Sequence, residues 1–168
     1  PNPNTFIQVI SNIKVAFNGA IGSYGSSITG YYAEIVGKNQ STSLNGGSLG
    51  IMNYHGAIKI RASVSDSRGR WSDTREVSVT VLEYFAPALS FNITRTGSTS
   101  STLTVTRNAK VAPLLISGSQ KNSMRLTFKV ARLGTDTYQV DNGQANGNWS
   151  SISSLVNSQA NLAGNYPS

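Results

Sequence analysis

The chain of 168 residues contains no cysteine, one histidine and few charged residues, which make up 12% of the sequence. Without cysteine there is no disulfide framework, no thiolate nucleophile and no thiolate metal ligand. One histidine likewise excludes a zinc site built from several histidines of this chain. Apolar runs are short: Val111 to Ile116 is interrupted by Pro113 and falls far short of the roughly 20 residues of a membrane helix. We therefore expect no cofactor, no metal and no membrane span.

Small polar residues dominate what is present, with 25 Ser, 14 Thr, 16 Asn and 16 Gly. This composition is typical of turns and of the polar faces of strands. It would also suit a disordered chain, but 38% of the residues are hydrophobic and they follow a regular pattern. No window of 11 or more residues shows a helical repeat with caps. Because the chain starts at Pro1 rather than at Met, we interpret it as a piece of a longer protein.

Apolar and polar side chains alternate in several segments, which is the pattern of half-buried strands. The clearest case is a predicted hairpin, with strands at residues 58–64 and 77–81 and a turn at Asp66 to Gly69. Asp141-Asn142-Gly143 predicts a two-residue hairpin turn of type I′. Further strands are predicted at residues 13–17, 28–36, 89–94, 103–106 and 124–130.

The alternating pattern stops near residue 84 and begins again beyond Pro87. We therefore predict an all-β protein with two domains, residues 1–85 and 86–168, each the size of a small β-sandwich. The predicted fold class is two tandem immunoglobulin-like or fibronectin III-like β-sandwich modules. Tyr84 and Phe85, beside Pro87, are expected to wedge the modules together. One larger sandwich or jelly roll is the alternative.

Groups that could act together in catalysis are sparse. Asp66 and Asp73 flank the predicted hairpin turn, where turn formation explains them better than a carboxylate pair for glycoside hydrolysis. His55 has no Gly-x-Ser-x-Gly elbow beside it. The segment from Asp141 to Gly147 lacks the alternating acids and the final Glu of a calcium loop. We therefore expect a protein that is not an enzyme and has no catalytic residue.

The net charge of +7 is divided unevenly between the predicted modules. Residues 1–85 hold seven basic and five acidic side chains, whereas residues 86–168 hold seven basic and two acidic ones. The second module therefore carries +5 and is expected to contact a polyanion. Nucleic acid is disfavoured, because no helix, RNA-binding aromatic motif or zinc finger presents the charges. A phosphate-bearing cell-wall polymer and plain solvated charges, which only keep the protein soluble, remain as alternatives.

The residues expected at such a contact are Arg107, Lys110, Lys121, Arg125, Lys129 and, for stacking on a sugar ring, Trp149. Arg95 and Arg132 complete the basic set of this module. Other aromatic residues predicted on loops or edges include Trp71 and Tyr166. Large aromatic residues are more often part of a core than of a ligand platform, so burial is the competing interpretation for both tryptophans.

Several segments resemble known phage proteins. The hairpin IKIRASVSDSRGRWSDTREVSVTVLEY, residues 58–84, resembles the final hairpin of immunoglobulin-like or fibronectin-like modules in phage tail and bacterial surface proteins. With ITGYYAEIVGKNQ, GGSLGIMNYHG, YFAPALSFNITRTGSTSSTLTVTRNAKVAPL and SLVNSQANLAGNYPS, nearly the whole chain resembles the minor structural protein family of streptococcal siphophages. That family supplies no catalytic motif to carry over.

The resemblance implies a non-enzymatic component of the virion tail, part of a tip or fibre, located outside the cell and at the host surface on contact. Such a protein would act as a spacer and hold the cell wall through many weak contacts. Its implied partners are other tail proteins, further copies of itself, and cell-wall polysaccharide or teichoic acid. A bacterial surface adhesin or spacer of the same fold is the alternative, and a wall-acting enzyme domain is less favoured.

Overall fold

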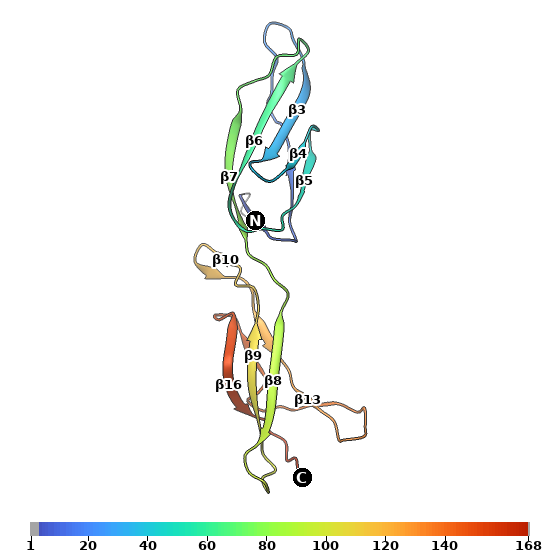
Figure 1. Cartoon of the computed structure of the whole chain (residues 1–168), viewed down its shortest axis with the longest axis vertical. Helices are drawn as coiled ribbons and strands as arrows, with labels where there is room; N and C mark the ends of the chain where they lie inside the picture. The colour runs from blue at the N-terminus through green and yellow to red at the C-terminus, as the bar shows by residue number, and fades with distance from the viewer. Residues whose placement is uncertain (1–3, 168) are drawn as a thin grey trace. The chain divides into compact units, whose positions relative to one another are not determined.

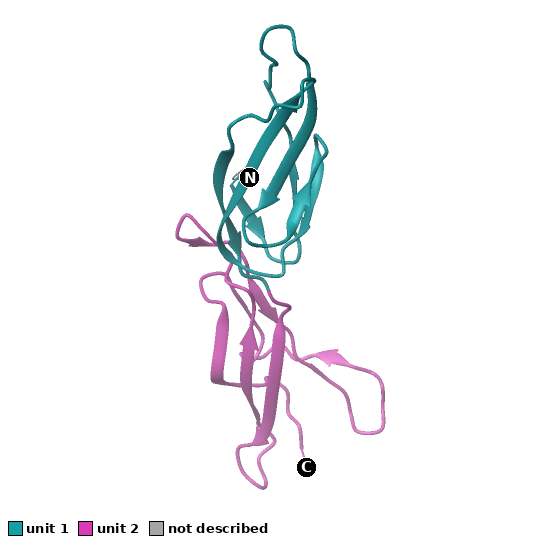
Figure 2. Ribbon diagram, turned by 45° about the horizontal axis from the view of Figure 1, so that its top comes forward, with its two compact units in different colours: residues 1–84 teal, residues 85–168 magenta. Residues whose placement is uncertain are grey.

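The computed structural model describes residues 4–167, which form strands and loops without any helix (Figure 1). The prediction of an all-β protein is therefore confirmed. The chain divides into two compact units, unit 1 at Pro1–Tyr84 and unit 2 at Phe85–Ser168 (Figure 2). This division falls one residue before the boundary that the restart of the alternating pattern predicts.

Unit 1 is built from two sheets, and its strands are β1 (Thr5–Ile7), β2 (Asn12–Val15), β3 (Ile28–Ile35), β4 (Gln40–Thr42), β5 (Gly47–Ile51), β6 (Gly56–Asp66) and β7 (Arg75–Leu82). One sheet has the strand order β1-β7-β6-β3-β4, and β2 pairs with β5 in the other. The β1–β7 pair is parallel, whereas β6 is antiparallel to both β3 and β7. Ile13 and Leu49 of the smaller sheet share one core with Ile35 and Val81 of the larger.

The predicted β6–β7 hairpin is confirmed, together with its turn. Asp66 Oδ1 accepts the backbone N–H groups of Arg68 at 2.9 Å and Arg70 at 3.0 Å, and Gly69 takes the positive φ of 76° that a side chain would disfavour. Hydrogen bonds from the Arg70 side chain and backbone, followed by the Arg68 N–H, lower the pKa of Asp66 to about 2. Asp66 thus serves turn formation, as its position in the sequence indicates.

Unit 2 consists of one longer sheet and several short ribbons. Its strands are β8 (Ala88–Arg95), β9 (Leu103–Lys110), β10 (Leu115–Ile116), β11 (Ser119–Gln120), β12 (Met124–Leu126), β13 (Lys129–Val130), β14 (Gln139–Val140), β15 (Gly147–Trp149) and β16 (Ser154–Asn161). The longer sheet has the order β16-β9-β8, and the ribbons are β10–β11, β12–β15 and β13–β14. Val105 and Ala109 of β9 form the core with Met124, Leu126 and Leu162.

Two local predictions for unit 2 are wrong. The single strand predicted at residues 124–130 is two short strands with different partners: β12 pairs with β15, and β13 pairs with β14. Between the two strands, the Phe128 N–H donates to Asn146 Oδ1 at 2.7 Å. The predicted type I′ hairpin is absent, because neither Asn142 nor Gly143 adopts positive φ. The strands on either side of this turn, β14 and β15, pair elsewhere, so the turn joins two ribbons rather than closing one hairpin.

Strand β8 forms an edge of the longer sheet in unit 2 and is only partly covered. Leu89, Phe91 and Ile93 lie on the same face as the buried Ala109, Arg107 and Val105 opposite them in β9. These three side chains of β8 are each about half exposed, although the Phe91 ring packs edge-on against Phe128 at 5.3 Å between centroids. Among the described residues, the apolar face of β8 is thus only partly covered, and that unit 2 is a closed sandwich stays a prediction.

Candidate functional site

Four of the predicted polyanion contacts, Lys110, Lys121, Arg125 and Lys129, are exposed. Lys110 Nζ lies 4.8 Å from the centre of the Phe85 ring, and Lys121 Nζ is 3.4 Å from Ser119 Oγ. The four side chains come from different strands or strand ends, and the structure does not gather them into one cavity. These four cations therefore do not form one compact site.

Arg107 was expected at the surface, and that expectation is wrong, because the residue is only 5% exposed. Its guanidinium donates to the backbone oxygen of Ala145 at 2.8 Å and to Ser158 Oγ at 2.8 Å, with longer bonds to the oxygens of Gln144 and Ser158. Burial lowers the pKa of Arg107. The residue lies on the core-facing side of β9, so it serves packing inside unit 2 and offers no charge to a partner.

Trp149 is partly buried in unit 2, so its ring is not the fully free stacking surface expected from the sequence. It packs against the core, and its ring lies 5.4 Å from Arg107 Cζ. The ring covers Gly147 so closely that a Cβ there would come within 2.4 Å of it. A sugar ring therefore cannot use the same face without displacing protein atoms.

The residues predicted at the module junction are each held by their own unit. The Tyr84 N–H donates to Gln8 Oε1 at 3.2 Å in unit 1, whereas Phe85 lies beside Lys110 in unit 2. Pro87 is exposed. That Tyr84 and Phe85 wedge the modules together stays a prediction.

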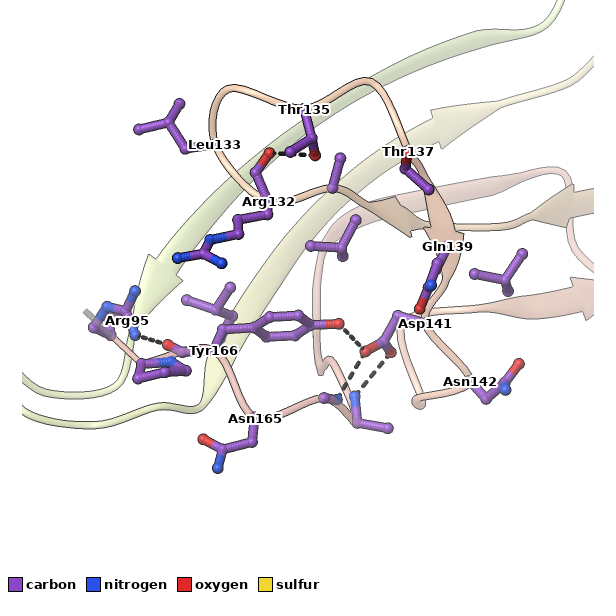
Figure 3. Close-up of a pocket in the computed structure, with 17 residues that line it drawn as sticks. Arg95, Arg132, Leu133, Thr135, Thr137, Gln139, Asp141, Asn142, Asn165 and Tyr166 are labelled. Atoms are coloured by element: carbon purple, nitrogen blue, oxygen red, sulfur yellow. Dashed lines mark hydrogen bonds between the residues drawn. The ribbon is translucent and has the colours of Figure 1, made fainter.

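Unit 2 contains a pocket of about 1210 Å³ that the sequence analysis did not predict (Figure 3). Four segments build it: the end of β8, the start of β9 at Leu103, the β13–β14 ribbon with its loop and the residues that follow, and the chain beyond β16. Its lining includes Arg95, Arg132, Leu133, Gln139, Asp141 and Tyr166. The structure thus brings together two arginines and a tyrosine that the sequence offered only as separate basic and aromatic candidates.

Asp141 fastens the C-terminal segment to the wall of this pocket. Its Oδ1 accepts the N–H groups of Gly143 and Ala163, each at 2.8 Å. Its Oδ2 accepts the Gly164 N–H at 2.8 Å and the Tyr166 hydroxyl at 2.6 Å (Figure 3). Burial alone would raise the pKa of Asp141, but these hydrogen bonds outweigh it and lower the pKa. Asp141 is therefore an ionised structural anchor whose acceptor positions are occupied by protein donors.

Tyr166 is held at both its backbone and its hydroxyl group. Its N–H donates to the Ser101 oxygen at 2.9 Å, and its own backbone oxygen accepts a hydrogen bond from Arg95 Nη1. A Cβ at Gly164 would lie 2.3 Å from the ring and from the hydroxyl oxygen, so glycine allows the ring to pack on the backbone. The hydrogen bond to Asp141, followed by burial, raises the pKa of Tyr166 to about 12.

The Tyr166 hydroxyl is expected to ionise late in an alkaline titration. Because its folded pKa exceeds the unfolded value of about 10, the stability it contributes is full below pH 10 and is lost as the pH rises toward 12. Tyrosinate absorbance should therefore show a late step that Tyr166→Phe removes. Complete ionisation of all tyrosines around pH 10 in the folded protein would contradict the hydrogen bond.

Arg132 is the least engaged cation of the pocket. Its backbone oxygen accepts hydrogen bonds from the Thr135 backbone N–H at 3.0 Å and from the Thr135 hydroxyl at 2.8 Å, and these bonds shape the β13–β14 loop. Its guanidinium makes no hydrogen bond or ion pair with any residue that the structure describes. Asp136 lies on the same exposed loop but does not line the pocket.

Side chains that could ligate a metal do not cluster in the part of the chain that the structure describes. Within residues 4–167, no group of three or more His, Cys, Asp or Glu side chains is placed to hold a metal ion. The described part of the chain also contains no helix of the length and apolarity needed to cross a membrane. What the pocket offers chemically is positive charge, a fixed aromatic ring, polar side chains and apolar surface from residues such as Leu103, Val130 and Leu133.

The chain belongs to a siphovirus protein family, because the family model described as "Siphovirus protein of unknown function (DUF859)" matches residues 1–168. The resemblance to siphophage proteins is thereby confirmed. No curated protein and no solved structure matches the chain. Membership in this family indicates a bacteriophage structural protein.

Proposed function

We propose that this chain is a non-enzymatic structural component of the siphovirus tail, part of a tip or fibre. In this proposal unit 1 acts as a spacer and unit 2 contacts a polyanionic polymer of the host cell wall, such as teichoic acid. Membership in a siphovirus family favours this function over a surface adhesin encoded by a bacterium. The contact would be weak in each copy and strengthened by several copies on one virion.

The distribution of ion pairs carries the proposal. In unit 1, three of the seven basic side chains form ion pairs: Arg61 with Glu76 at 2.8 Å, Arg70 with Asp66 at 2.7 Å, and Lys59 with Glu76 at 3.5 Å. Over residues 85–167 there is no ion pair at all. Arg107 is buried, but Lys110, Lys121, Arg125, Lys129 and Arg132 are exposed without an ion-pair partner in the described chain, so their charge is available to an external anion.

The strand pairing of unit 1 supports a spacer role. We propose that unit 1 is an immunoglobulin-like sandwich, because its order β7-β6-β3 corresponds to strands G, F and C of that fold, and β2–β5 to strands B and E. Such modules recur as compact building blocks joined end to end. Unit 2, with short ribbons around one sheet, has no such correspondence and is assigned the binding role.

Binding of the whole chain to purified teichoic acid tests the proposed function. We expect measurable binding at low salt and a linear fall of log K with log salt, with a slope of about −3 if four basic side chains each contact a phosphate. A neutral wall polysaccharide without phosphate is the control and should not bind measurably. Absence of binding to teichoic acid at low salt would contradict the proposal, and so would a binding constant that does not change with salt concentration. Stronger binding to single-stranded nucleic acid under the same conditions would favour the nucleic-acid alternative.

A further inference from the structure

We propose that the pocket of unit 2 binds one phosphate-bearing sugar unit, with Arg132 and Arg95 contacting the phosphate and the face of the Tyr166 ring contacting the sugar. The inference rests on the proposed function, because it names the part of a wall polymer that would be recognised and the place where this occurs. It differs from the diffuse attraction of the exposed lysines, since a pocket selects a ligand by shape as well as by charge.

The charge balance of the pocket favours an anion. Asp141 is its one lining carboxylate among the described residues, and four protein donors already occupy its two oxygens. Both Nη1 hydrogen bonds of Arg95 go to backbone oxygens, of Ser100 and Tyr166, which leaves Nε and Nη2 without an acceptor in the described chain. With the uncommitted guanidinium of Arg132, the pocket presents the planar N–H donors that bind phosphate in pairs.

Polar side chains around the arginines favour a ligand rich in hydroxyl groups. Thr137, Gln139, Asn142 and Asn165 line the pocket, and none makes a side-chain hydrogen bond to another described residue. Amide and hydroxyl side chains both donate and accept, which matches the hydroxyl groups of a sugar. An inorganic anion alone would leave these groups without a role.

The aromatic surface is fixed before any ligand arrives. Tyr166 is restrained by Asp141 at its hydroxyl, by Arg95 and Ser101 at its backbone, and by the close approach of Gly164 beneath its ring. Figure 3 shows Arg132 extending from the β13–β14 loop into the same pocket. A rigid ring loses little conformational freedom on binding, so even a small ligand can gain from the contact.

A titration of the whole isotope-labelled chain with glucose 1-phosphate, followed by NMR, tests the pocket. We expect saturable shifts centred on Arg132, Asn165 and Tyr166, with a Kd of about 1 mM, and weaker binding of glucose and of inorganic phosphate tested separately. Arg132→Met should weaken binding about tenfold, since the side chain is exposed and its loss leaves the fold intact. Arg75→Met, which removes an exposed arginine of unit 1 that neither lines the pocket nor belongs to the exposed cations of unit 2, is the control and should change the Kd less than twofold.

The possible outcomes separate this inference from the proposed function. Equal losses in the Arg132→Met and Arg75→Met variants, or shifts spread over all basic residues, would overturn the assignment of sugar-phosphate binding to the pocket. So would binding of inorganic phosphate as tight as that of the sugar phosphate. In each case salt-dependent binding of teichoic acid would still support the proposed function. Saturable binding of glucose 1-phosphate in the pocket without any binding of teichoic acid would instead retain the pocket and contradict the wall-polymer role.

Discussion

Replacing Asp141 by Asn is expected to destabilise unit 2 by about 3 kcal/mol, because it removes a buried charge that holds four donors. The side chain is 5% exposed, so water cannot replace what is lost. An amide has only one oxygen, and its NH₂ group would face either two backbone N–H groups or one N–H and the Tyr166 hydroxyl. The C-terminal segment would then lose its attachment to the pocket wall.

Unfolding in urea measures this effect unit by unit. Each unit contains one tryptophan, Trp71 in unit 1 and Trp149 in unit 2, so the fluorescence of a Trp71→Phe background reports on unit 2 alone. Asp136→Asn, on the exposed β13–β14 loop, is the matched control and should change the free energy of unfolding by less than about 0.5 kcal/mol. Equal stability of the Asp141→Asn and Asp136→Asn variants would contradict the anchoring role.

The dependence of this effect on pH has a definite sign. Because the folded pKa of Asp141 is lowered, its stabilisation is full above the unfolded pKa of about 3.9 and is lost as the pH falls through the folded value. The difference in stability between wild type and Asp141→Asn should therefore shrink as the solution is acidified below pH 4. A difference that stays constant over this range would show that the ionised carboxylate is not the source of the stabilisation.

Arg107→Met is expected to destabilise unit 2 by about 3 kcal/mol as well. The substitution leaves the backbone oxygens of Ala145 and Ser158 without their donor inside the unit, and it removes the cation beside the Trp149 ring. Arg107→Lys should recover only part of the loss, since one ammonium group cannot reproduce the planar set of donors. Urea unfolding followed by Trp149 fluorescence measures both variants.

Arg125→Met provides the control for Arg107, because Arg125 is exposed and projects from a neighbouring part of unit 2. We expect it to change stability by less than about 0.5 kcal/mol and to weaken binding of teichoic acid modestly. If Arg107→Met left stability unchanged while weakening polymer binding, Arg107 would be a surface contact after all, as the sequence analysis proposes.

Much of the fold could be predicted from the sequence where strands are half buried. Strands β6, β7, β8 and β9 alternate apolar and polar side chains, β3 is rich in β-branched and aromatic residues, and the predicted segments fall on all five. The turn at Asp66 was predictable because its chemistry is local: an aspartate accepts N–H groups two and four residues further on, and a glycine takes positive φ. Alternation therefore predicts which face of a strand its apolar side chains share, but not how fully that face is covered, since the apolar side chains of β8 stay about half exposed.

The errors arise where distant parts of the chain decide the structure. The neighbouring residues indicate that Asp141 forms a turn. Its hydrogen-bond partners Ala163 and Tyr166, however, lie 22 and 25 residues further on, and a local sequence pattern cannot predict such distant contacts. The break between β12 and β13 depends likewise on which ribbon each half joins. Arg107 is different: it shares parity with the apolar Val105 and Ala109, so its inward position was recoverable from the alternation.

The central claim is that the attraction to a cell-wall polyanion resides in unit 2 rather than in the net charge of the chain. Two variants of the whole chain test this claim. Each removes four exposed positive charges, so the two variants have the same net charge as each other. The unit 2 variant is K110Q/K121Q/R125Q/K129Q, and the unit 1 variant is K14Q/K38Q/R68Q/R75Q. Their dissociation constants for purified teichoic acid are measured at the same low salt concentration. We expect the unit 2 variant to lose about tenfold or more in affinity and the unit 1 variant less than about twofold; equal losses would contradict the assignment of binding to unit 2.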